Sequence, residues 1–177
     1  MSELSASIRD PRIASVFRLW QECRSRRFVR PGDLDINSIP GSLPLLYVID
    51  VPPLKQLTPE RIRYQYVGQE VARSLGINAA GMTIAEVLAR PAAASFTSAI
   101  RGLLRDPCIL HSVHVNHLPN VTEVRTERLI LPVSESSDVV EGFCVAFSKL
   151  ERSPLNRLHE KSDAQEVWPE TLHKLRL

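Results

Sequence analysis

The chain has 177 residues, 44% of them apolar, and a formal net charge of +2, which fits one domain that buries its own core and gives no argument for nucleic-acid binding. Its three cysteines, Cys23, Cys108 and Cys144, form no C-x-x-C pair, so the sequence indicates neither a zinc site nor a redox dithiol. The first residues lack the basic and apolar regions of a secretory signal, and the most apolar stretch, 43–49, is too short to cross a membrane, so we expect a cytoplasmic protein without a membrane span.

The first predicted element is an amphipathic helix near the N-terminus. Asp10 can accept hydrogen bonds from free backbone N–H groups, and Pro11 suits the first helical position, so the helix should begin there and end near residue 27. Apolar residues follow at three- and four-residue steps, which puts them on one stripe: Ile13, Val16, Phe17, Trp20 and Cys23. The stripe must cover either the domain's own sheet or a second subunit. We predict a homodimer formed partly through Val16, Phe17 and Trp20.

The central region, residues 41–151, shows strand patterns at both ends and helical patterns between them. The run 45–51 is β-branched and aromatic, and residues 61–67 alternate strictly, so that Ile62, Tyr64 and Tyr66 should share one face. Helices are predicted over 69–75, 84–88 and 91–104, and strands over 108–115, 121–133 and 139–150. This order predicts an α+β fold with one antiparallel sheet and helices over one face, preceded by the N-terminal amphipathic helix.

Composition divides the chain into three parts. Residues 1–40 hold the N-terminal helix and a turn, residues 41–151 form the domain, and residues 152–177 are a polar tail. We expect the tail to be a poorly ordered extension in which residues 169–177 can form a short helix.

Several short motifs occur in the order found in a stand-alone PAS family common in alphaproteobacteria, and over residues 16–150 the chain resembles that family. The matching motifs are Leu19-Trp20, Asp33-Leu34-Asp35, the strand Leu45 to Asp50, the strand end Tyr64 to Gly68, Leu75-Gly76 with Gly81, and Leu131-Pro132-Val133-Ser134. The resemblance implies a five-stranded antiparallel sheet in the order 2-1-5-4-3 with the helical middle cupped over it. It also implies a sensory or regulatory module in bacterial signalling, with no catalysis, that binds an unknown small molecule, a signalling protein, or both.

A PAS-type pocket lies between the sheet and the longest helix, so inward-facing residues are the candidate ligand contacts. We single out Tyr64, Tyr66, Phe96, His111, Arg128 and Phe143, each of which could instead be ordinary core packing. Arg128 is the most informative of them, because a lone arginine on a largely apolar strand face is unusual unless it meets an acid or a ligand.

A three-residue repeat of metal-ligand types runs through Cys108, His111, His114 and His117. Side chains alternate on a strand, so His111 and His117 should face one way while Cys108 and His114 face the other. One cation cannot bind all four, and we predict no metal site. The longest helix has no haem-binding histidine and the segment 78–80 has no flavin-reactive cysteine, so the resemblance implies neither haem nor covalent flavin, while a non-covalent small molecule is allowed.

Two other function classes stay open. A small cone-shaped enzyme of the ketosteroid-isomerase type would act on an apolar small molecule through a His or Asp in a deep cavity; two strands ahead of the helical middle argue against it, and a buried His111 paired with a carboxylate would argue for it. A nucleic-acid adaptor would use the basic cluster Arg24–Arg30, but we expect no such binding at physiological salt.

Glu123, Arg125 and Glu127 alternate on one strand face, which favours a charge ladder over an acid–base pair.

Overall fold

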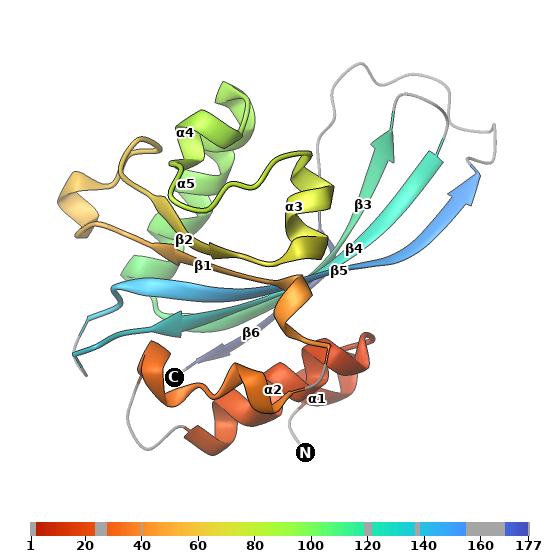
Figure 1. Cartoon of the computed structure of the whole chain (residues 1–177), viewed down its shortest axis with the longest axis horizontal. Coiled ribbons are helices and arrows are strands. Elements are labelled where there is room, and N and C mark those ends of the chain that lie inside the picture. The colour runs from red at the N-terminus through yellow and green to blue at the C-terminus, as the bar shows by residue number, and fades with distance from the viewer. Residues whose placement is uncertain are drawn as a thin grey trace.

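A single six-stranded antiparallel sheet organises the molecule (Figure 1). The computed structural model describes residues 3–23, 28–39, 41–118, 122–136, 139–154 and 169–176. The strands are β1 (Leu46–Asp50), β2 (Arg63–Val67), β3 (Cys108–Leu118), β4 (Thr122–Val133), β5 (Gly142–Pro154) and β6 (Pro169–Arg176). They lie in the order β2-β1-β5-β4-β3-β6. The predicted α+β class is therefore confirmed, but the sheet has six strands where five were expected.

Helices cover both faces of this sheet. One face carries α3 (Gln69–Leu75), α4 (Ile84–Val87) and α5 (Arg90–Arg105), and the opposite face carries α1 (Glu3–Ser7) and α2 (Pro11–Cys23) (Figure 1). Short 3-10 helices occur at Pro31–Asp33, Ile36–Ser38, Leu43–Leu45 and Leu54–Gln56. Strand alternation gives each face its own apolar core, because successive side chains point to opposite sides. We call them the α5 face and the α2 face.

The stripe on α2 covers the chain's own sheet. Asp10 caps the helix as predicted, since its Oδ1 accepts the Arg12 backbone N–H at 2.8 Å. Val16, Phe17 and Trp20 are at most 2% exposed and pack with residues of β4 and β5. These three side chains therefore have no exposed surface that a second subunit could contact. The predicted dimer contact through them is wrong for this structure, because packing against the chain's own sheet already removes the stripe from water.

The C-terminal tail supplies the sixth strand. Residues 169–176 pair antiparallel with β3 from Cys108↔Arg176 to His114↔Pro169. The expected disorder or short helix is therefore wrong for this segment. A strand forms here because the edge of β3 presents backbone N–H and C=O groups that the tail can pair with, and a helix could not make these hydrogen bonds. Leu175 also packs against the α2-face core. Residues 155–168 lie outside the described part of the chain.

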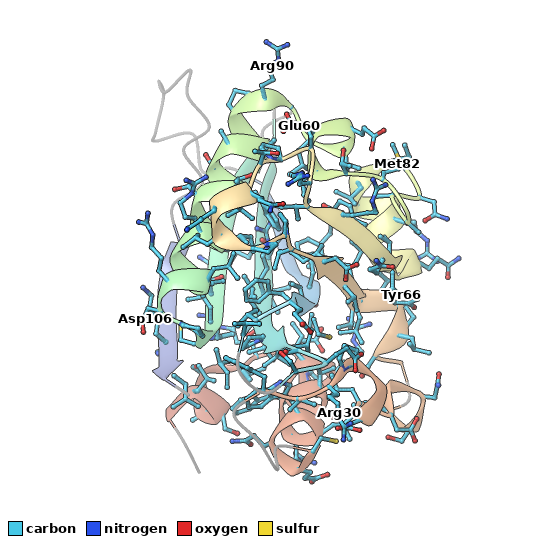
Figure 2. All side chains as sticks on the ribbon, turned by 90° about the vertical axis from the view of Figure 1, so that its left-hand side faces the viewer. Arg30, Glu60, Tyr66, Met82, Arg90 and Asp106 are labelled. Carbon is cyan, nitrogen blue, oxygen red and sulfur yellow. The ribbon has the colours of Figure 1, made fainter. Side chains whose placement is uncertain are left out.

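An irregularity in β2 separates the two tyrosines that were expected to share a face. Tyr64 pairs with Ile49 and Tyr66 with Val48, so the register shifts by one residue between them. A shift of one residue moves a side chain to the other side of a sheet. Tyr64 is therefore buried on the α5 face, whereas Tyr66 is 38% exposed and lies at the surface (Figure 2).

Candidate ligand-binding site

A cation lies among mostly apolar groups on the α5 face. Arg128 on β4 stands opposite Ser112 on β3 and opposite Phe147 on β5. Its guanidinium carbon is 5.5 Å from the centre of the Phe147 ring, a distance at which cation and ring attract each other. The Arg128 Nε is buried and has no hydrogen-bond partner among the described residues. None of the salt bridges within the described residues involves Arg128.

A second polar atom without a partner lies one register step away on the same face. His114 Nε2 is 2.8 Å from the Ser112 hydroxyl, while His114 Nδ1 is buried and finds no hydrogen-bond partner in the part of the chain that the structure describes. Burial and the positive charge of Arg128 lower the pKa of His114 to about 4. The imidazole is therefore neutral at pH 7. If Ser112 donates to Nε2, the unused Nδ1 carries the proton and is a free donor.

An open hollow lies beside Phe147, the ring that Arg128 contacts; Arg128 and His114 themselves are not among the described residues that line it. It has a volume of about 230 Å³, and its lining includes Phe147 and Lys149 from β5 with Glu70 and Arg73 from α3. Glu70 Oε1 accepts a hydrogen bond from Arg12 at 2.8 Å, so its charge is already compensated. No ion pair of Arg73 or Lys149 is found in the described ranges. Together with Arg128, this makes three cations for which the described residues provide no acidic ion-pair partner.

Aromatic side chains close the same face on the β1–β2 side. The rings of Tyr47 and Tyr64 lie 5.7 Å apart and are tilted by 59°. Burial raises the pKa of both phenols, so both are neutral at physiological pH. Phe143 is fully buried and Phe96 on α5 is half-buried against them. These residues form the apolar wall behind Arg128.

Four of the six predicted ligand contacts thus lie on one side of the sheet: Tyr64, Phe96, Arg128 and Phe143. The other two do not. The Tyr66 hydroxyl donates to the Leu43 carbonyl at 3.1 Å at the surface, because the shifted register turns it away. His111 lies on the α2 face, so it cannot share a pocket with Arg128.

His111 belongs to a buried polar network beneath α1. Its Nε2 is 2.8 Å from Glu127 Oε1, its Nδ1 is 3.2 Å from the Ser7 hydroxyl, and its ring stacks on that of His173 at 5.8 Å. Glu127 also accepts the backbone N–H groups of Arg9 and Asp10, each at 2.8 Å. Glu127 is fully buried; the side chain of Glu123 lies outside the described part of the chain, so the charge ladder of Glu123, Arg125 and Glu127 stays a prediction.

Ser7, His111 and Glu127 occur in the order of a serine–histidine–acid triad, but the geometry favours a structural role. The Ser7 hydroxyl donates to the Leu4 carbonyl at 2.7 Å, and the Glu127 carboxylate already binds two backbone N–H groups. The hollow described above lies on the opposite face, away from Ser7. In this arrangement the Ser7 proton is directed at the Leu4 carbonyl and not at His111, whereas a nucleophile must give its proton to the base.

A chain of polar contacts joins this network to the hollow. The Ser148 hydroxyl donates to Asp10 Oδ2 at 2.5 Å, and Arg12 bridges Asp10 at 2.9 Å and Glu70 at 2.8 Å. Burial opposes ionisation of Asp10, but the hydrogen bonds from Arg12 and Ser148 outweigh it, so the pKa of Asp10 is lowered. Arg12 therefore connects the N-terminus of α2 with α3, which borders the hollow.

Sequence reasoning missed several residues of this site. Strand alternation could have placed Ser112 and His114 beside Arg128 once the β3–β4 register was known, and Phe147 and Lys149 follow from the alternation of β5. Glu70 and Arg73 lie on a short helix whose pattern carries no signal for a pocket.

The described residues hold no group of three or more His, Cys, Asp or Glu side chains able to bind a metal. Cys108 packs in the α5-face core and His111 faces α2, as strand alternation predicted; the side chain of His117 lies outside the described part. Among the residues placed, no helix is long and apolar enough to cross a membrane. A comparison of the chain with models of known protein families, with curated proteins and with solved structures gives no match.

Proposed function

We propose that this chain is a PAS-type sensory or regulatory module that binds a small molecule beside Arg128, in the hollow between α3 and the sheet, and passes its state to a signalling protein. Strand order supports the proposal, because β2-β1-β5-β4-β3 is the order expected of a PAS fold. The three helices between β2 and β3 are also where that fold has them. In this view β6 is an addition at the free edge of β3.

The observation that carries the proposal is the buried Nε of Arg128, which has no hydrogen-bond partner in the described part of the chain. A buried polar atom without a partner costs about 1–3 kcal/mol, so proteins rarely keep one without a use. Two such atoms, Arg128 Nε and His114 Nδ1, occur near each other and near an open hollow. A molecule bound in the hollow would lie against Phe147, whose ring contacts the guanidinium of Arg128.

The contact between Arg12 and Glu70 supplies a route from the ligand to the N-terminal helices. A ligand that moves α3 changes this ion pair, and the ion pair in turn holds Asp10 at the start of α2. We propose that the outer side of α2, rather than its buried stripe, presents the state to a partner. A homodimer remains part of the proposal, and sedimentation of the wild-type protein tests it.

One observation favours the enzyme alternative: His111 is buried and paired with Glu127. Every polar atom of that pair has a protein partner. A substrate would have to displace α1 to reach it. We therefore favour a non-catalytic module.

Native mass spectrometry of the protein purified from its own host tests the proposal. We expect a retained small molecule in the wild type and its loss in Arg128→Gln. Arg105→Gln is the matched control, since Arg105 is an exposed arginine at the end of α5. The proposal fails if the wild type retains nothing and no member of a fragment library binds near Phe147 by NMR.

A further inference from the structure

The N-terminal helix and the C-terminal strand meet over His111 on β3. The Nδ1 of His111 is 3.2 Å from the hydroxyl of Ser7, the last residue of α1, and its ring stacks on His173 of β6 with 5.8 Å between the ring centres. Helix α1 also packs against β6. The imidazole of His111 is fully buried as a result.

The hydrogen bonds of this cluster set the number of protons on the imidazole. The Ser7 hydroxyl directs its single proton at the Leu4 carbonyl, 2.7 Å away, so the contact between Ser7 and Nδ1 needs a proton on Nδ1. At the other nitrogen, Nε2, the carboxylate of Glu127 lies 2.8 Å away, and its two oxygens already accept the backbone N–H groups of residues 9 and 10. A carboxylate can only accept, so this contact needs a second proton on the ring.

The pair of His111 and Glu127 thus holds one proton more than a neutral imidazole and a carboxylate would. Burial agrees with this count, because neither side chain is more than 1% exposed. A carboxylate beside a neutral ring would leave an uncompensated charge inside the protein, whereas the shared proton makes the pair neutral as a whole. Two backbone N–H donors favour the ionised form of Glu127, so the proton belongs to the ring and His111 is an imidazolium.

We infer that this proton is a latch: while the pair of His111 and Glu127 holds it, α1 and the start of α2 stay closed on the sheet, and its loss opens them. Without the proton, Glu127 becomes an uncompensated buried charge, and the Ser7 hydroxyl must leave the Leu4 carbonyl to donate to Nδ1. Water can solvate the carboxylate once the N-terminal segment, whose backbone Glu127 binds, moves away. The proposed ligand site lies on the other face of the sheet and uses none of these groups.

Charged or titratable side chains occur on each element packed against the pair. They are Glu3 on α1, whose side chain lies outside the described residues, Arg9 and Asp10 before α2, Arg12 on α2, Arg125 on β4 and His173 on β6. Asp10 forms its salt bridge with Arg12, and Glu127 forms its own with His111. Arg9 is exposed and His173 is only half-buried, so water screens a charge on either of them more than it screens the pair.

Opening should increase with pH. In an opened segment water surrounds both groups, and a histidine with its ordinary pKa of about 6.5 is mostly neutral above pH 7 while a glutamate is ionised. Opening therefore releases one proton, so the ratio of open to closed molecules rises above pH 7 by at most about tenfold for each pH unit. His114 acts in a lower window, because its pKa is lowered from 6.5 to about 4, and the two effects are separable.

Two measurements on the full-length chain test the latch. Imidazole ¹⁵N spectra at pH 7, with the signal identified by its loss in His111→Gln, should show both nitrogens of His111 protonated in the wild type. Amide hydrogen exchange, corrected for the intrinsic rate at each pH, should show residues 3–10 opening about tenfold more at pH 9 than at pH 7, relative to β1. Glu127→Gln should abolish this dependence on pH, and Glu135→Gln, at an exposed position, should keep it.

The wild-type protein decides the outcome even where Glu127→Gln does not fold. A single protonated nitrogen on His111 at pH 7 overturns the latch, and so does equal opening of residues 3–10 at pH 7 and pH 9. Both results leave the proposed ligand site untouched, because that site is judged by the molecule retained in the wild type and lost in Arg128→Gln.

Discussion

His111 Nε2 and Glu127 Oε1 lie 2.8 Å apart, and neither side chain is more than 1% exposed. The pair does more than join two neighbouring strands. Because Glu127 also accepts the backbone N–H groups of Arg9 and Asp10, it ties β4 to the segment that begins α2. Free N–H groups at the start of a helix need acceptors, and a buried carboxylate is a strong one.

Replacing Glu127 with glutamine should destabilise the protein by about 3 kcal/mol, because one oxygen then replaces two and the buried pair with His111 is broken. Urea unfolding at pH 7 measures the change. Glu135→Gln makes the same replacement at an exposed position and should change stability by less than about 0.5 kcal/mol. Equal stabilities of the two variants would contradict the structural role of the pair.

Acid should reduce stability through His114. Its pKa is lowered from 6.5 to about 4, first by burial and then by Arg128. Between these values the unfolded chain binds a proton that the folded chain does not, so stability falls as the pH drops from 7 towards 5. His114→Gln should show a smaller fall over this window. Urea unfolding of both proteins at pH 7 and pH 5 measures it, and an identical fall in the two would contradict the shift.

Local sequence signals predicted elements well. Asp10 and Pro11 fixed the start of α2 through capping, and Thr83 forms the expected cap of α4 with Glu86 at its third position. Alternation placed Cys108 and His111 on opposite faces. Each of these features depends on residues close together in the chain, which is why a sequence can reveal it.

Features that depend on distant partners could not be read in the same way. Glu127 meets a backbone N–H that is 118 residues away in sequence, and its spacing from Arg125 suggested only a charged face. The shifted register that turns Tyr66 outwards needs β1 beside it, and β6 needs the edge of β3. The candidate site follows the same rule: Arg128 was identified as unusual, but its neighbours come from three elements.

Trp20→Ala should unfold the protein or destabilise it by about 3–5 kcal/mol, the usual cost of removing a buried large side chain. Trp20 is 0% exposed within the single chain, so a substitution here acts on the packing of the chain itself. Circular dichroism during urea unfolding measures the cost, with Arg18→Ala on the exposed side of α2 as control. A different result would support a dimer contact at this stripe. In that case the wild type sediments as a dimer, while Trp20→Ala is folded, has unchanged stability and sediments as a monomer.

Two glycines with opposite surroundings give a matched test of packing near the hollow. A Cβ on Gly68, which begins α3, would lie 2.5 Å from the Pro44 carbonyl oxygen, whereas a Cβ on Gly102 in α5 would meet nothing within 4 Å. Gly68→Ala must push the backbone of residues 43–44 away and should cost at least about 1–3 kcal/mol. Gly102→Ala removes an exposed helical glycine and should stabilise by about 0.5–1 kcal/mol. Thermal unfolding of both variants measures the two effects. Stabilisation by Gly68→Ala would mean that α3 does not approach residues 43–44 so closely, and the hollow beside it would then have a different shape.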